Sequence, residues 1–148
     1  MIPRWAVIVF LIVSVLGFLD ATYLTVEHYR GVIPPCSLVE GCETVLASEY
    51  AAVWGIPVAL LGAVYYLFMS ILALLYLDRG NVKALIGAAW GTILGLLASS
   101  WFLFVQFAIL RAVCLYCLLS AASSLLLFAL GMWFLYRMRR TSHEAAVI

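Results

Sequence analysis

Residues 112–136 read AVCLYCLLSAASSLLLFALGMWFLY, a run that contains no charged side chain. A helix needs about 20 mainly apolar residues to cross the hydrocarbon core of a bilayer, so this run is long enough to span a membrane. Three similar runs precede it, at about residues 5–26, 56–77 and 82–109. Because backbone groups in lipid must pair internally, each run is expected to be a helix. The sequence therefore predicts an all-α membrane protein, a bundle of four transmembrane helices in one domain over residues 1–148.

The composition of the whole chain agrees with this interpretation. Of its 148 residues, 68% are hydrophobic and 10% are charged, and the mean hydropathy is +1.18. A soluble domain is nearer half apolar and a quarter charged, so no soluble catalytic domain is expected beside the bundle. The first run is predicted to be a retained helix, not a cleaved signal peptide, because it carries Asp20 and no small-x-small site follows it. The net charge of +1 gives no indication of a nucleic-acid partner.

The basic residues predict the orientation of the bundle in the membrane, because cytoplasmic loops carry an excess of lysine and arginine. Six of the eight lie at the chain ends or between the second and third runs: Arg4, Arg79, Lys83, Arg137, Arg139 and Arg140. Only Arg30 and Arg111 lie on the other side. Both termini are therefore expected to be cytoplasmic and all four cysteines to face outward, toward the compartment that is oxidising in bacteria. The expected location is a prokaryotic cell membrane.

The segment 27–55 is expected to form a cap on the outer side of the bundle. Prolines at positions 34 and 35 prevent the first helix from continuing. From Thr44 to Trp54, apolar side chains follow a helical spacing of i, i+4, i+7 and i+8. They are Leu46, Tyr50, Val53 and Trp54. This pattern predicts a short helix on the outer membrane surface, with its aromatic side chains in contact with lipid.

Cys114 and Cys117 are the strongest candidates for chemistry. Residues three apart share one face of a helix, and Cys114 is expected in the opening turn of the fourth helix. There the positive end of the helix dipole and the charge of Arg111 would favour the reactive thiolate. Cys117 would lie about one turn deeper, inside the bundle. The pair is predicted to pass electrons from the water side to an acceptor in the membrane. The alternative is that both are free cysteines that only pack as small hydrophobic side chains.

Cys36 and Cys42 lie in the outer loop and enclose a short segment. They could form a static disulfide, or a mobile one that exchanges with the first pair through a mixed disulfide. Because Cys114 and Cys117 are expected on the same side of the membrane, we favour the mobile disulfide, which would shuttle electrons to that pair. Four cysteines could also bind zinc, but the unequal spacings and the oxidising face argue against it, so no metal is predicted.

A quinone dissolved in the lipid is the predicted electron acceptor. The sequence has no dinucleotide-binding glycine motif, no haem-attachment motif and no soluble domain for a flavin. A quinone ring needs a flat apolar pocket with a few polar groups, for which the candidates are Ser48, Trp54, Phe104 and Phe107. Asp20 lies within a membrane span and is a candidate for proton transfer, or is solvated at the interface. Gly87, Gly91, Gly95 and Ser99 recur every four residues, which favours close helix packing or leaves room for a flat ligand.

The order of these motifs resembles the vitamin K epoxide reductase family. The resemblance is carried by Asp20-Ala-Thr-Tyr-Leu-Thr-Val-Glu-His-Tyr, Cys36-x5-Cys42, Ser48, Trp54-Gly-Ile-Pro and Cys114-Leu-Tyr-Cys117. It implies a four-helix bundle around a quinone of the ubiquinone or menaquinone type. It also implies that Cys114 and Cys117 are the active-site pair, with Cys117 facing the quinone. Cys36 and Cys42 would be the shuttle, Cys42 would form the mixed disulfide with Cys114, and Ser48 would assist the shuttle.

The resemblance also suggests which reaction to expect. Prokaryotic members oxidise thioredoxin-like proteins, often through a fused C-terminal domain, and this chain stops at Ile148 without one. Its expected partner is therefore a separate thioredoxin-fold protein. The animal enzymes have a tyrosine four residues after the second active-site cysteine, where this chain has Ala121. A disulfide-generating thiol:quinone oxidoreductase is therefore preferred over a quinone-epoxide reductase. A non-catalytic membrane protein with structural disulfides is the remaining alternative.

Overall fold

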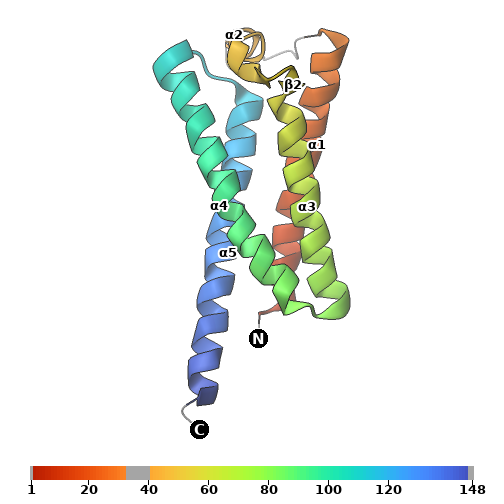
Figure 1. Cartoon of the computed structure of the whole chain (residues 1–148), viewed down its shortest axis with the longest axis vertical. Coiled ribbons are helices and arrows are strands. Elements are labelled where there is room, and N and C mark those ends of the chain that lie inside the picture. The colour runs from red at the N-terminus through yellow and green to blue at the C-terminus, as the bar shows by residue number, and fades with distance from the viewer. Residues whose placement is uncertain (1, 33–40, 147–148) are drawn as a thin grey trace.

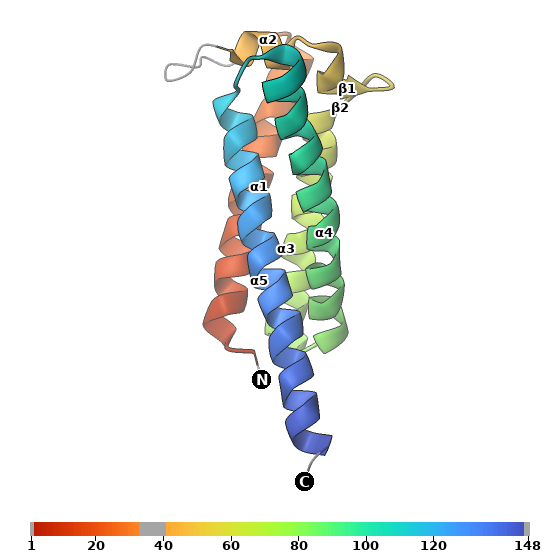
Figure 2. The same cartoon turned by 90° about the vertical axis from the view of Figure 1, so that its left-hand side faces the viewer.

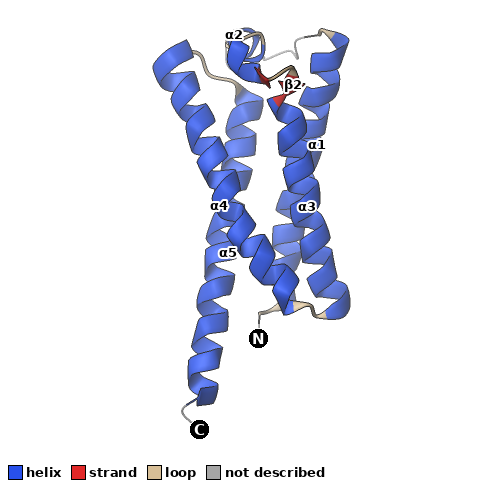
Figure 3. Ribbon diagram, in the orientation of Figure 1, coloured by secondary structure: helices blue, strands red, loops and turns tan. Residues whose placement is uncertain are grey.

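The computed structural model describes residues 2–32 and 41–146, with side chains up to residue 141. Cys36, one of the predicted shuttle cysteines, lies outside the described residues. Four long helices dominate the structure (Figures 1 and 3), and their bounds are α1 Arg4–Arg30, α3 Val58–Arg79, α4 Val82–Phe104 and α5 Leu115–Ala146. A six-residue π-helix, η2 (Val105–Leu110), extends α4. All four are long and apolar enough to cross a membrane, which confirms the predicted helical membrane bundle.

The helices form a closed ring in which each one packs against two others. Helix α1 contacts α3 and α5, and α4 contacts the same two helices. Both termini and the α3–α4 turn lie at one end, and the cap lies at the other (Figure 1). Gly80, in the left-handed conformation, ends α3, and the Asn81 side chain accepts hydrogen bonds from the first free backbone N–H groups of α4. These two residues produce the sharp turn between the helices.

The cap consists of four short elements above the bundle (Figure 2). They are α2 Cys42–Leu46, the 3-10 helix η1 Glu49–Ala51, β1 Ala52–Val53 and β2 Ile56–Pro57. The prediction of one helix from Thr44 to Trp54 is therefore wrong. The hairpin pairs Val53 with Ile56, and both turn residues, Trp54 and Gly55, have positive φ as a two-residue type I′ turn requires. The glycine and the β-branched residues beside the turn favoured a hairpin over a helical turn.

The main hydrophobic core occupies the half of the bundle nearer the termini. Phe10 of α1 packs on Phe134 of α5 with ring centroids 5.8 Å apart, and Met69 and Leu85 are fully buried beside them. The glycine stripe of α4 faces α3: a Cβ atom at Gly91 would overlap Met69, and one at Gly95 would overlap Tyr65. The predicted packing role is thus confirmed for these two glycines. Gly95 and Ser99 also line the cavity described below.

Candidate active site

Cys114 lies at the junction of η2 and α5, directly under the cap. It is the residue before α5, and its carbonyl accepts the hydrogen bond of the Leu118 N–H at 3.0 Å. It therefore caps the helix, one residue earlier than the predicted opening turn. Its side chain is 0% exposed and, like that of Cys117, it is a free thiol. Cys117 lies one turn deeper, as predicted.

The Cys114 thiol is more acidic than that of a free cysteine. A hydrogen bond from the Cys117 side chain is the main cause that lowers the pKa of Cys114, and the backbone N–H groups of Cys117 and Tyr116 also lower it, against the opposing effect of burial. Free N–H groups at a helix start stabilise a thiolate in this way. The stabilisation comes from these hydrogen bonds and not from the charge of Arg111 that the sequence suggested.

The cap brings Cys42 to Cys114. Cys42 opens α2, is 1% exposed and is disulfide-bonded. It belongs to one buried cluster with Val45 and Cys114, against which Cys117 also packs. The residue before it, Gly41, lies so close to the residue before Cys114 that a Cβ atom there would come within 2.8 Å of the Val113 backbone N and O. The absence of a side chain at Gly41 therefore permits the contact between cap and active site.

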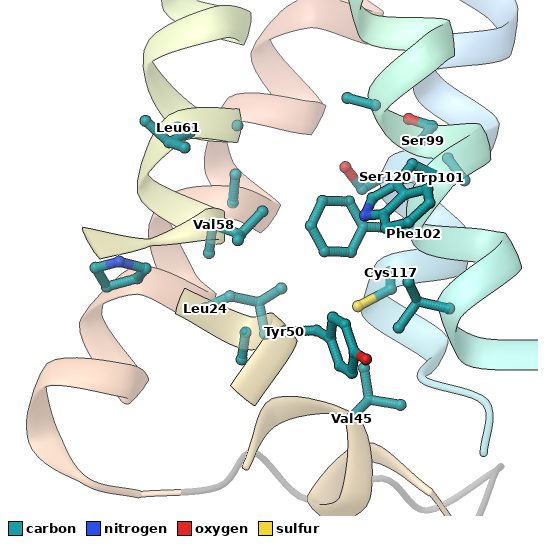
Figure 4. A pocket seen from close by; sticks show the side chains of 18 of the residues that line it. Leu24, Val45, Tyr50, Val58, Leu61, Ser99, Trp101, Phe102, Cys117 and Ser120 are labelled. Atoms are coloured by element: carbon teal, nitrogen blue, oxygen red, sulfur yellow. The ribbon is translucent and has the colours of Figure 1, made fainter. Parts of the chain in front are cut away.

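A cavity of about 560 Å³ opens beneath the cap, between the four helices. Its lining is mainly apolar, with residues from all four long helices and from the cap. In Figure 4 the sulfur of Cys117 and the rings of Tyr50 and Phe102 point into the same space, with Leu24 and Val58 opposite. The deeper active-site cysteine is thus part of the cavity wall. Cavities of this size and character are typical of sites for small apolar ligands.

Three residues of the cavity lining carry buried polar atoms that have no hydrogen-bond partner in the described part of the chain. These atoms are Asp20 Oδ2, Tyr65 Oη and Gln106 Nε2. Buried polar atoms in proteins are nearly always paired with protein or water, so these three atoms are candidates to pair with a polar group of a ligand. Asp20, the predicted proton-transfer candidate, lines the same cavity as Cys117.

The structure brings some of the predicted ligand-contacting residues to the cavity and not others. Ser48 lines it, and its hydroxyl donates to the Val45 carbonyl at 2.7 Å. Trp54 is 98% exposed at the tip of the hairpin, and Phe104 and Phe107 are more than half exposed; none of the three lines the cavity. For these three residues the predicted cavity position is corrected. The aromatic residues that line it are instead Tyr50, Tyr65, Tyr66, Trp101 and Phe102, although Trp101 is itself 56% exposed.

Gln106 is a site residue that the sequence reasoning missed. It lies in η2, is 1% exposed, and its side-chain Oε1 accepts a hydrogen bond from the Cys114 N–H at 2.9 Å. The signal was present in the sequence, because Gln106 is the one strongly polar residue in the apolar run from Trp101 to Leu110. A polar side chain within a membrane span is a functional candidate by default.

The model of the vitamin K epoxide reductase family matches residues 8–132. The chain belongs to this family. The match covers the cap, the residues that line the cavity, and both Cys114 and Cys117, and no curated protein matches the chain. As a member of the vitamin K epoxide reductase family, the protein is an integral, multi-pass membrane oxidoreductase. Reductases of this family use a quinone or vitamin K as electron partner.

Proposed function

We propose that this member of the family is a thiol:quinone oxidoreductase that generates disulfides. A separate thioredoxin-fold protein gives two electrons and two protons through Cys36 and Cys42 to Cys114 and Cys117. The pair then reduces a quinone of the ubiquinone or menaquinone type to the quinol. In the balanced reaction, one partner dithiol becomes a disulfide for each quinone reduced.

One observation carries the proposal: Cys114 lies between Cys42 and the cavity. It shares a buried cluster with Cys42, while its hydrogen-bond partner Cys117 forms part of the cavity wall. Two cysteines that only filled space would not connect a disulfide-bonded cap to an apolar cavity. The arrangement supports a relay from a water-side thiol to a ligand within the membrane.

The exchange steps follow from this placement. The Cys42 thiolate attacks Cys114 in the Cys114–Cys117 disulfide, which breaks that bond and releases Cys117 as a thiolate beside the cavity. Cys36 then attacks Cys42 in the mixed disulfide, so that the cap disulfide forms and Cys114 leaves as a thiolate. A thiol of low pKa leaves faster in such exchanges, and the hydrogen bonds that lower the pKa of Cys114 favour this step. Ser48 is proposed to assist the shuttle, since it lies beside α2 and donates to Val45.

The residues of the cavity fit a quinone. Its volume of about 560 Å³ and its apolar walls suit a flat ring, and the unpaired polar atoms of Tyr65 and Gln106 are donors for acceptor oxygens. A bound quinone supplies an acceptor for two electrons and two protons. Asp20, whose Oδ2 is buried at the cavity, is proposed to deliver a proton there.

The proposed orientation puts both termini in the cytoplasm and the cap outside. Arg4 is the first residue of α1, and Arg79 and Lys83 flank the α3–α4 turn, at the same end of the bundle as the termini (Figure 1). The excess of basic residues at this end supports a cytoplasmic location. The cysteines would then face the outer, oxidising compartment of a prokaryotic cell, where a disulfide-generating enzyme acts.

Reduction of a quinone epoxide is the alternative reaction in this family. Ala121 lines the cavity at the position where the animal enzymes have a tyrosine. A methyl group at this position offers no hydroxyl to an epoxide oxygen, which supports the quinone as the proposed substrate.

The test follows quinone absorbance with the purified protein and a reduced thioredoxin-like protein. Wild type should reduce quinone and oxidise the partner in equal amounts, whereas Cys117→Ser should lose quinone reduction yet still form mixed disulfides. Ser123→Ala is the matched control, because Ser123 lies on the same helix and does not line the cavity. Full turnover in Cys117→Ser would refute the proposal, and consumption of quinone epoxide alone by the wild type would favour the alternative.

A further inference from the structure

Gln106 organises the turn that leads into the active site. Its backbone carbonyl accepts hydrogen bonds from the N–H groups of Arg111 and Ala112, and its side-chain Oε1 accepts the N–H of Cys114 at 2.9 Å. Three backbone donors after the helix are therefore satisfied by this one residue. The π-helical winding of η2 places it there, and such windings occur frequently at functional sites.

The hydrogen bond to Cys114 determines which end of the Gln106 side-chain amide is the oxygen and which is the nitrogen. A backbone N–H is a donor, so the atom that faces Cys114 must be the acceptor oxygen, and the NH₂ group must occupy the other end. This Nε2 is buried and meets no acceptor within the residues that the structure describes. The hydrogen bond from Cys114 satisfies the side-chain oxygen of Gln106, but the two N–H donors of the same side chain remain unused.

Gln106 lines the same cavity as Cys117. We propose that Gln106 Nε2 donates a hydrogen bond to a carbonyl oxygen of the quinone and so holds that oxygen beside the active-site pair. This inference rests on the proposed function. A quinone ring offers only acceptors, which matches an unused donor, and the bond strengthens as the oxygen gains negative charge during reduction. The amide would thus join the backbone of Cys114 to the ligand through one planar group.

The other unpaired donor of the cavity lies too far away for this role. The Tyr65 hydroxyl lies against Gly95 of α4, which precedes Gln106 by eleven residues. At 1.5 Å per residue, the two positions are about 16 Å apart along the helix. Gln106 is the donor attached to the Cys114 end of the cavity, and Tyr65 serves a deeper part of the ligand space.

The experiment compares two ligands that differ only in their oxygens. Menadione (2-methyl-1,4-naphthoquinone) and 2-methylnaphthalene fill nearly the same volume, and only menadione can accept a hydrogen bond. Their affinities for the protein in nanodiscs are measured by equilibrium dialysis, and the binding of each compound to empty nanodiscs is subtracted. Gln106→Leu should weaken menadione binding about tenfold and change 2-methylnaphthalene binding less than twofold. Ile109→Ala, a change in the same segment outside the cavity lining, should change neither affinity.

The ratio of the two affinities separates a ligand contact from a purely structural role. If Gln106→Leu does not fold, Gln106→Met keeps the length of the side chain and is tested by the same ratio. Equal losses for both ligands, or an unchanged ratio, would overturn the inference. If wild type still reduces menadione in that case, the proposed function stands. A wild-type protein that neither binds nor reduces menadione would refute both.

Discussion

Replacing Gly41 with alanine is expected to slow exchange between the cap and the active site. The new Cβ would lie 2.8 Å from the backbone N and O of Val113, whereas ordinary contacts begin at 3.4 Å. The cap must therefore retreat by about 0.6 Å, because Val113 is backbone that cannot rotate away. Disulfide geometry is narrow, and a misplacement of about 1 Å can cost about a hundredfold in rate. We expect formation of the Cys42–Cys114 disulfide to slow about tenfold.

The assay uses a chain in which Cys36 and Cys117 are replaced by serine, so that only Cys42 and Cys114 can pair. Disulfide formation after addition of diamide is followed by mass spectrometry of quenched samples. Gly87→Ala is the matched control, because the nearest atom to its added Cβ is Leu72 Cδ1 at 4.0 Å. Equal rates for Gly41→Ala and the control would refute the reasoning that close approach at Gly41 sets the position of Cys42.

Three further outcomes are expected. The ultraviolet absorbance of the Cys114 thiolate, taken as the difference from Cys114→Ser, should rise with a midpoint below that of a free cysteine, because hydrogen bonds lower the pKa of this thiol; a midpoint at or above the usual value of about 8.5 would contradict this. Tyr66→Phe removes hydrogen bonds to Ser120 and Ser124, so thermal unfolding in detergent should show a loss of about 1–2 kcal/mol; no loss would mean that these bonds contribute nothing. Asn81→Ala removes the cap of α4 and should cost about 1 kcal/mol in the same assay.

The sequence predicted the bundle well because the backbone of a chain in lipid must form its hydrogen bonds internally. Long apolar runs must be helices in a membrane, and each of the four runs corresponds to one long helix, although α5 continues beyond residue 136 to Ala146. The cap was harder to predict, since apolar residues spaced like a helix can also form a hairpin. Trp54 and Gly55 both have positive φ, which makes this segment a hairpin turn and not a helix. A positive φ at a tryptophan could not be predicted from its residue type.

The sequence pointed to the cysteines as candidates for chemistry, but it did not identify the residues that line the cavity. Cys114 and Cys117 stand out because their spacing and position are rare in an apolar segment. Phe104 and Phe107 were plausible wall residues by type, yet they do not line the cavity, whereas Trp101 and Phe102 do. The rotation of a helix that is apolar on all sides leaves little trace in its sequence. Only packing against its neighbours determines which aromatic residues reach the interior.

The complete burial of Cys114 determines which molecules can exchange electrons with it. A side chain with 0% exposure offers no approach to a thiol dissolved in the surrounding water. Its neighbours in the fold are Cys42, delivered by the cap, and Cys117, at the cavity wall. Direct attack on Cys114 by a small dissolved thiol is therefore blocked in this conformation, whereas the sulfur of Cys42 already lies in the same buried cluster.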